Sequence, residues 1–253
     1  MAGQDLRGAR IEHAYLTDAR FHDVDLTGAR FNLVDLTGVS IRGAAVVNVD
    51  ISGEIDNVRV NGVDVVPLVE AELNRRYPDR PKMRPTTAGG YRDAWDVVER
   101  LWGETVERAR ALPPEMLHQR VDDEWSFIET QRHLLHASDK WLGNPVLEED
   151  EPYHPLGFGP GGDPDGVPGI TVDADPSLEE ILTPRLARMA TMRTFVAGVT
   201  DADLDRLCTR KPIGNDPDAD YTVRRCLKVV LAEEAEHHRY AVRDLAAITA
   251  GRG

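Results

Sequence analysis

Every fifth residue in the first fifty is apolar, and this spacing restricts the fold more than any other feature of the sequence. A period of five fits neither the 3.6-residue repeat of a helix nor the two-residue repeat of a strand. It predicts a coil that turns a corner every five residues, with the large apolar side chains pointing to the axis. Small residues, mostly Ala and Val, stand two positions before the later members. The row consists of Leu6, Ile11, Leu16, Phe21, Leu26, Phe31, Leu36, Ile41, Val46 and Ile51.

This pattern resembles that of the pentapeptide-repeat family, whose members form a right-handed quadrilateral β-helix. The resemblance implies such a coil over residues 1–66, with Ile55, Val60 and Val65 continuing the row after a slip of one position. A solenoid needs several stacked repeats to bury its core, and this one has only about three turns. We therefore expect the coil to pack on the rest of the chain or on a second subunit, and a homodimer is the expected assembly.

Charge and composition narrow the choice of partners and compartment. The formal net charge of −14 argues against direct binding of nucleic acid, which needs clustered Lys and Arg, and against an anionic membrane surface. An acidic coil can also mimic DNA, so contact with a DNA-binding protein is an alternative. The polar start of the chain lacks the pattern of a signal peptide, and no apolar stretch is long enough to span a membrane. The two cysteines form no CxxC pair, so we expect a cytoplasmic protein with free thiols.

The rest of the chain is predicted to be helical. Residues 67–87 read as a short helix and a proline-rich linker, and residues 88–253 as an all-α module. Its four longer helices are expected at residues 91–112, 126–142, 177–198 and 222–249. The second and third helices are separated by a long glycine- and proline-rich connection that includes residues 154–162. Long loops of this kind often act as lids, and the connection predicts a bundle with a crossover.

The last helix carries a candidate metal-binding pair. Helical periodicity places Glu234 and His238 on the same apolar face as Leu227 and Leu231. Their spacing of four residues lets the two side chains converge on one point. A carboxylate that faces a core is costly unless it is paired or bound to a metal. Glu233 and His237, at the edge of the stripe, form the alternative pair. A third interpretation is that Glu234 and His238 are an ordinary pair on the helix surface and bind no metal.

The second helix adds a histidine in a recognisable context. Residues 125–134 read Trp-Ser-x-x-Glu-x-x-x-His-Leu, in which Ser126 and Glu129 predict a capping box and His133 follows one turn later. His136 is a competing ligand. This motif is similar to the second-helix signature of the DinB-like (DinB/YfiT-type) superfamily of metalloenzymes. The fourth helix of that superfamily carries His-x-x-x-His followed by Arg. In this chain Glu234 stands at the position of the first His.

The resemblance covers about residues 88–250 and implies an up-down-down-up four-helix bundle with one divalent metal ion, usually held by three histidines. Zinc is the first expectation, with Fe(II), Ni or Mn as alternatives. The expected metal ligands are His133, Glu234 and His238, with Glu233 and His237 as the alternative pair. The expected residues around the metal or in the pocket are Glu129, His154 and Arg239. Trp125, Trp141 and Tyr240 are expected to pack rather than to line a pocket.

Two functions of different classes follow from these observations. Superfamily members include S-transferases and isomerases that use mycothiol, bacillithiol or glutathione, which implies a metal-dependent transferase or hydrolase with a small molecule or low-molecular-weight thiol as substrate. The metal would lower the pKa of a thiol or of water. The alternative is a non-catalytic scaffold, with a degenerate metal site and a repeat coil that binds a partner.

Overall fold

The chain forms two compact units, Met1–Glu54 and Ile55–Gly253. The computed structural model describes residues 5–32, 34–53, 55–122, 124–159, 167 and 169–251. The sequence predicts the border between coil and linker at residue 66, and residues 55–66 belong to the second compact unit.

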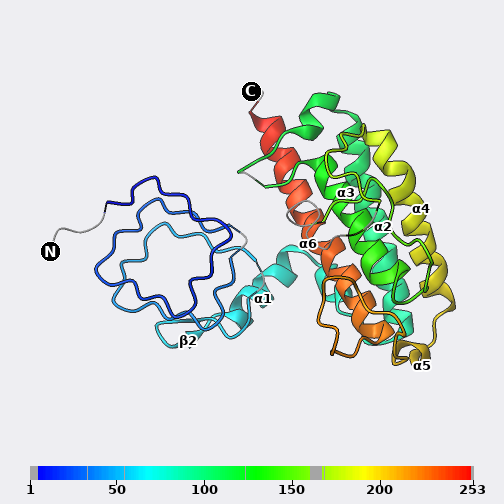
Figure 1. The fold of residues 1–253 in the computed structure, drawn as a ribbon, viewed down its shortest axis with the longest axis horizontal. Coiled ribbons are helices and arrows are strands. Elements are labelled where there is room, and N and C mark those ends of the chain that lie inside the picture. Colours follow the sequence, from blue (N-terminus) through cyan, green and yellow to red (C-terminus); the bar gives the residue numbers. More distant parts are fainter. Residues whose placement is uncertain are drawn as a thin grey trace. The chain divides into compact units, whose positions relative to one another are not determined.

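Left-handed backbone recurs at every fifth position that the structure describes in the first unit. The residues with positive φ are Gly8, His13, Asp18, Asp23, Gly28, Gly38, Gly43, Asn48 and Gly53. Glycine adopts this conformation freely, and Asn, Asp and His tolerate it better than other residues do. Backbone turns close between Leu6 O and Ala9 N and again at ten-residue intervals. The described part of this unit is thus a coil of regularly spaced turns without β-strands (Figure 1).

The apolar row of the coil stays half exposed, which differs from the predicted buried axis. Its side chains range from 51% exposed at Leu26 to 72% at Ile41 and Ile51. All described residues of this unit are exposed. The physical reason is that no second layer of side chains covers the row within the described part of this unit, so it lacks the partner surface that a buried core needs.

A short hairpin ends the five-residue spacing. Strands β1 (Arg59–Val60) and β2 (Val63–Asp64) pair in antiparallel fashion. Asn61 and Gly62 between them both have positive φ, as a two-residue type I′ turn requires. The expected continuation of the coil at Val60 and Val65 is therefore replaced by a turn whose geometry Asn-Gly dictates.

The helical module follows the linker. Its elements are α1 (Val66–Arg76), the 3₁₀ helix η1 (Arg80–Met83), α2 (Ala88–Arg110), the 3₁₀ helix η2 (Pro114–His118), α3 (Phe127–Ser138), the π-helical turn η3 (Asp139–Gly143), α4 (Leu178–Gly198), α5 (Asp201–Leu204) and α6 (Val223–Ala250). Helices α2, α3, α4 and α6 lie side by side and pack against one another (Figure 1). None of the described helices combines the length and apolarity needed to cross a membrane.

The core lies between these four helices, and their first residues are set by capping side chains. Trp95 of α2, Leu134 of α3, Ile181 of α4 and Leu227 of α6 are all fully buried. The Ser126 hydroxyl accepts a hydrogen bond from Glu129 N, and the Glu129 carboxylate accepts one from Ser126 N. This confirms the predicted capping box. Cys208 and Cys226 are free cysteines in the structure. Of the glycine-rich loop, residues 160–162 lie outside the described residues.

Candidate metal centre

Three potential metal ligands meet where α3 packs on α6. His133 comes from α3, and Glu233 and His237 come from successive turns of α6. Their ligand atoms all lie within 4.8 Å of one another. Glu233 Oε2 is 3.1 Å from His133 Nε2 and 3.2 Å from His237 Nε2. One carboxylate oxygen thus stands between two imidazole nitrogens.

The structure brings His133 together with the alternative pair, Glu233 and His237, and not with Glu234 and His238. The apolar stripe does turn Glu234 inward, as its periodicity predicts, and that side chain is buried. Inward, however, means toward Arg185 of α4, whose Nη2 donates to both carboxylate oxygens at 2.6 and 2.5 Å. The face that meets His133 lies at the edge of the stripe, one residue earlier along the helix.

His238 occupies a different surface of α6. Its Nε2 is 2.9 Å from Thr105 Oγ1 and 3.2 Å from Leu101 O, both on α2. Its ring stands edge-on to Trp102 with centroids 5.1 Å apart. His238 therefore packs between helices, away from the cluster formed by His133.

Aromatic rings cover the cluster, and sequence reasoning missed them. Trp125 lies against His133, with ring centroids 4.5 Å apart, and stacks on His237 at 5.6 Å with planes 16° apart. Phe158 meets the edge of Trp125 at 5.6 Å. The sequence predicts a packing role for Trp125, and the signal for its place beside the cluster is its position just before Ser126, the cap of α3. His133 is buried beside these rings, whereas His237 stays partly exposed.

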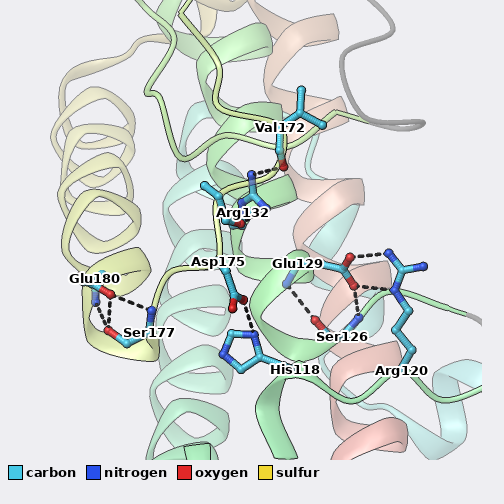
Figure 2. A network of polar contacts seen from close by, with 10 residues as sticks. His118, Arg120, Ser126, Glu129, Arg132, Val172, Asp175, Ser177 and Glu180 are labelled. Carbon is cyan, nitrogen blue, oxygen red and sulfur yellow. Dashed lines mark hydrogen bonds and ion pairs between the residues drawn. The ribbon is translucent and has the colours of Figure 1, made fainter. Parts of the chain in front are cut away.

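The loop that carries Phe158 is tied to α3 by the neighbour of His133. Arg132 donates to the carbonyls of Leu156, Thr171, Val172 and Ala174 at 2.6–3.0 Å. Figure 2 shows this guanidinium reaching the Val172 carbonyl, near the His118–Asp175 contact. This buried cation thus holds two described segments of the loop, one at Leu156 and one at residues 171–174. The Phe158 carbonyl then lies 3.2 Å from His133 Nδ1.

The surroundings favour the protonation states that bind metal. Burial lowers the pKa of His133, against the opposing effect of its hydrogen bond to Glu233, and so favours the neutral imidazole. Burial alone would raise the pKa of Glu233, but its hydrogen bonds to His133 and His237 hold that pKa well below its usual range. A neutral imidazole and an ionised carboxylate are the forms that ligate divalent cations.

The donor set fits a divalent metal ion. Ligand atoms that share a tetrahedral zinc ion lie about 3.3 Å apart, close to the two separations measured around Glu233 Oε2. A metal-binding histidine typically donates its second N–H to a carbonyl or carboxylate, and the Phe158 carbonyl is placed to accept from His133 Nδ1. Held by two imidazoles and one carboxylate, a divalent ion would keep further coordination positions open.

The other sequence candidates have different roles. Glu129 caps α3 and forms an ion pair with Arg120 (Figure 2). Arg239 donates to Glu236 and stacks on the ring of Tyr240.

His154 lies along an open cleft of about 490 Å³ that α3, η3, α4 and the loop line. Its backbone N–H donates to Asp139 Oδ2, and its Nδ1 accepts from Leu156 N. His136 of α3 lies against the ring of Tyr153. Neither histidine belongs to the described cluster of three ligands.

Comparison with known proteins agrees with both units. The family model of the DinB superfamily matches residues 98–241, more than half of the chain, and includes all three clustered residues. Pentapeptide repeats match in eight copies over residues 5–43 and 14–53. No curated protein and no solved structure matches the chain. The chain carries pentapeptide repeats at its N-terminal end and belongs to the DinB superfamily.

Proposed function

We propose that the helical module holds one divalent metal ion on His133, Glu233 and His237 and acts as a metal-dependent enzyme. The observation that carries this proposal is the convergence of three ligand atoms within 4.8 Å at the α3–α6 contact. Membership of a superfamily that typically binds a metal supports it. Zinc is the preferred ion, because two imidazoles and a carboxylate form a common catalytic zinc set, and Fe(II), Ni and Mn are the alternatives.

The protein's own groups would orient and shield the reacting centre. The Phe158 carbonyl fixes the ring of His133 through Nδ1, and Trp125 packs over both imidazoles. Arg132 keeps the loop, and with it Phe158, in place. When bound, a divalent metal would lower the pKa of a thiol or of water and so supply a nucleophile near neutral pH.

We infer a small molecule, with a low-molecular-weight thiol as one reactant, as the substrate class. The reaction would be a thiol-dependent S-transfer or isomerisation, or a hydrolysis if water takes the thiol's place. In this proposal the module is a DinB-like four-helix bundle of α2, α3, α4 and α6. The repeat unit is a quadrilateral β-helix, and the protein is a cytoplasmic homodimer.

Metal analysis of matched variants tests the ligand set. Protein purified without added metal should contain one tightly bound divalent ion per chain. His237→Ala should lose that ion, because it removes one of three ligands, whereas His238→Ala should keep it, because His238 contacts Thr105 and Leu101 instead. Elemental analysis and a competitive zinc titration measure both. Retention by His237→Ala with loss by His238→Ala would reject this set in favour of Glu234 and His238.

Turnover is a separate question from metal content. Wild-type protein should transfer mycothiol, bacillithiol or glutathione to an electrophilic small molecule, and His237→Ala should lose this activity with its metal. A metal-loaded protein that is inactive with all three thiols, and toward hydrolysable esters and amides, would argue against the enzyme.

A scaffold is the second candidate, and one observation favours it. The apolar row of the coil is 51–72% exposed, which is typical of a surface that a partner covers. In this case the metal centre would be a relic, with weakly bound, substoichiometric metal. Pull-down with the full chain, compared with a Phe21→Asp variant of the row, would separate a docking coil from one that only supports the module.

A further inference from the structure

Helix α6 carries two overlapping Glu–His pairs, and the fold uses them differently. Glu233 and His237 meet His133, whereas Glu234 and His238 lie one residue further along the same helix. Successive residues of a helix point about 100° apart. A rotation of α6 by that angle would offer a chemically equivalent pair to His133. Something outside the two pairs must therefore select between them.

The buried apolar stripe of α6 alone discriminates only weakly between these two rotations of the helix. Its apolar members tolerate small rotations, because volume-conserving exchanges and shifts of aliphatic side chains cost little. At the centre of the stripe stands Glu234 instead of an aliphatic residue, and both its side chain and that of Arg185 are about 1% exposed. Unlike aliphatic contacts, this pair is directional, since one guanidinium nitrogen must reach both carboxylate oxygens.

The pair is poorly suited to a purely stabilising role. Nε and Nη1 of Arg185 are buried and have no hydrogen-bond partner among the described residues. Unsatisfied buried donors are costly, and replacing a buried ion pair by apolar side chains is often neutral or stabilising. Buried ion pairs that cost stability are in some proteins devices of register and specificity.

We propose that Arg185 is a positioning residue whose ion pair with Glu234 fixes the rotation of α6 that presents Glu233 and His237 to His133. This inference rests on the proposed metal centre for its purpose, but the positioning itself is a property of the metal-free protein. The contacts of His238 with α2 act in the same sense, because they hold the next turn of α6 in the same rotation.

The test replaces the ion pair without leaving a lone buried charge. The variant is Arg185→Met with Glu234→Met, and the matched control is Leu182→Met with Leu231→Met. The control residues lie on the same two helices and are equally buried. Both double variants should keep the helix content and melting temperature of the wild type or exceed them. The first should bind zinc about tenfold more weakly or worse, and the control should bind like the wild type.

A measurement on the metal-free protein tests the rotation of α6 independently of the proposed metal function. The ring protons of His133 and His237 lie against Trp125, so their NMR shifts report the rotation of α6 without any ion. These shifts should move in the Arg185/Glu234 variant and stay in the control. Wild-type zinc affinity and unmoved shifts in the Arg185/Glu234 variant would overturn the proposal, as would equal losses in both variants. If the wild type binds no zinc while the shifts still move, the metal function fails and the positioning role stands.

Discussion

The repeat coil and the helical module both contain regular rows of apolar side chains, but only the helical module buries them. Phe21 of the coil is 65% exposed, whereas Trp95 of α2 is fully buried. Polar groups follow the same division. Asp25 accepts from Thr27 two residues away, whereas Glu234 is bound by Arg185 from another helix. Burial therefore gives this polar group of the module a fixed partner on another helix, whereas the polar group of the coil is paired with a near neighbour in sequence.

The largest expected difference between the regions is the cost of removing an aromatic ring. Trp95→Ala should lower the free energy of unfolding by about 3–5 kcal/mol, because it leaves a cavity among α2 and its neighbours. Phe21→Ala should cost less than about 1 kcal/mol, because most of that ring already contacts water. Urea titration of the full chain followed by circular dichroism measures both. A similar cost for the two variants would mean that the row of the coil is covered in solution, for example in a dimer.

The next expected difference is that an aspartate of the module and one of the coil make folding stability depend on pH in opposite directions. Burial raises the pKa of Asp139 to about 7 despite its ion pair with Arg188, whose guanidinium also pairs with Glu149 at the same cluster. The folded protein therefore keeps a proton that the unfolded chain releases near pH 4, and stability falls as pH rises toward 7. Between pH 5 and pH 7 this amounts to roughly 2 kcal/mol. Asp139→Asn should remove that part of the slope in urea titrations at several pH values.

The coil supplies the control for this measurement. Hydrogen bonds from Thr27 lower the pKa of Asp25. The stabilisation that ionised Asp25 gives the folded protein is therefore present above the ordinary pKa range of Asp and is lost as pH falls. Asp25→Asn should thus change the profile only at acidic pH. An unchanged slope in Asp139→Asn between pH 5 and pH 7 would show that the Asp139 carboxyl is ionised throughout, with Arg188 compensating its burial.

The smallest expected effects have opposite signs at two glycines. An added Cβ meets no atom within 4 Å at either Gly28 or Gly103, so only backbone conformation distinguishes them. Gly28→Ala should destabilise by about 1 kcal/mol, because φ is +76° at that corner. Gly103→Ala should stabilise by about 0.5–1 kcal/mol, because Gly103 lies inside α2. Calorimetric melting of both variants checks the signs, and a stabilised Gly28→Ala would contradict the left-handed corner.

Much of this architecture could be predicted from local sequence signals. The five-residue spacing predicted the turns of the coil, and Ser126 with Glu129 predicted the start of α3, because both depend on residues close in sequence. The half-exposed row was not predictable, since burial depends on what covers a surface. Which of the two Glu–His pairs meets His133 was left open by the sequence for a related reason. Both are compatible with the same helix, and the contact that separates them comes from Arg185, a residue of α4.

The regular left-handed corners also determine how such a coil can change length during evolution. Removing any five consecutive residues from its interior leaves every later corner in phase, because the residue types at Asp18, Asp23 and Gly28 serve the same conformation. Inserting a single residue moves every later apolar side chain out of the apolar row. It also places β-branched residues at corners that need positive φ. Loss or duplication of whole units of five codons is therefore the tolerated mutation, and neighbouring copies can be exchanged without loss of phase.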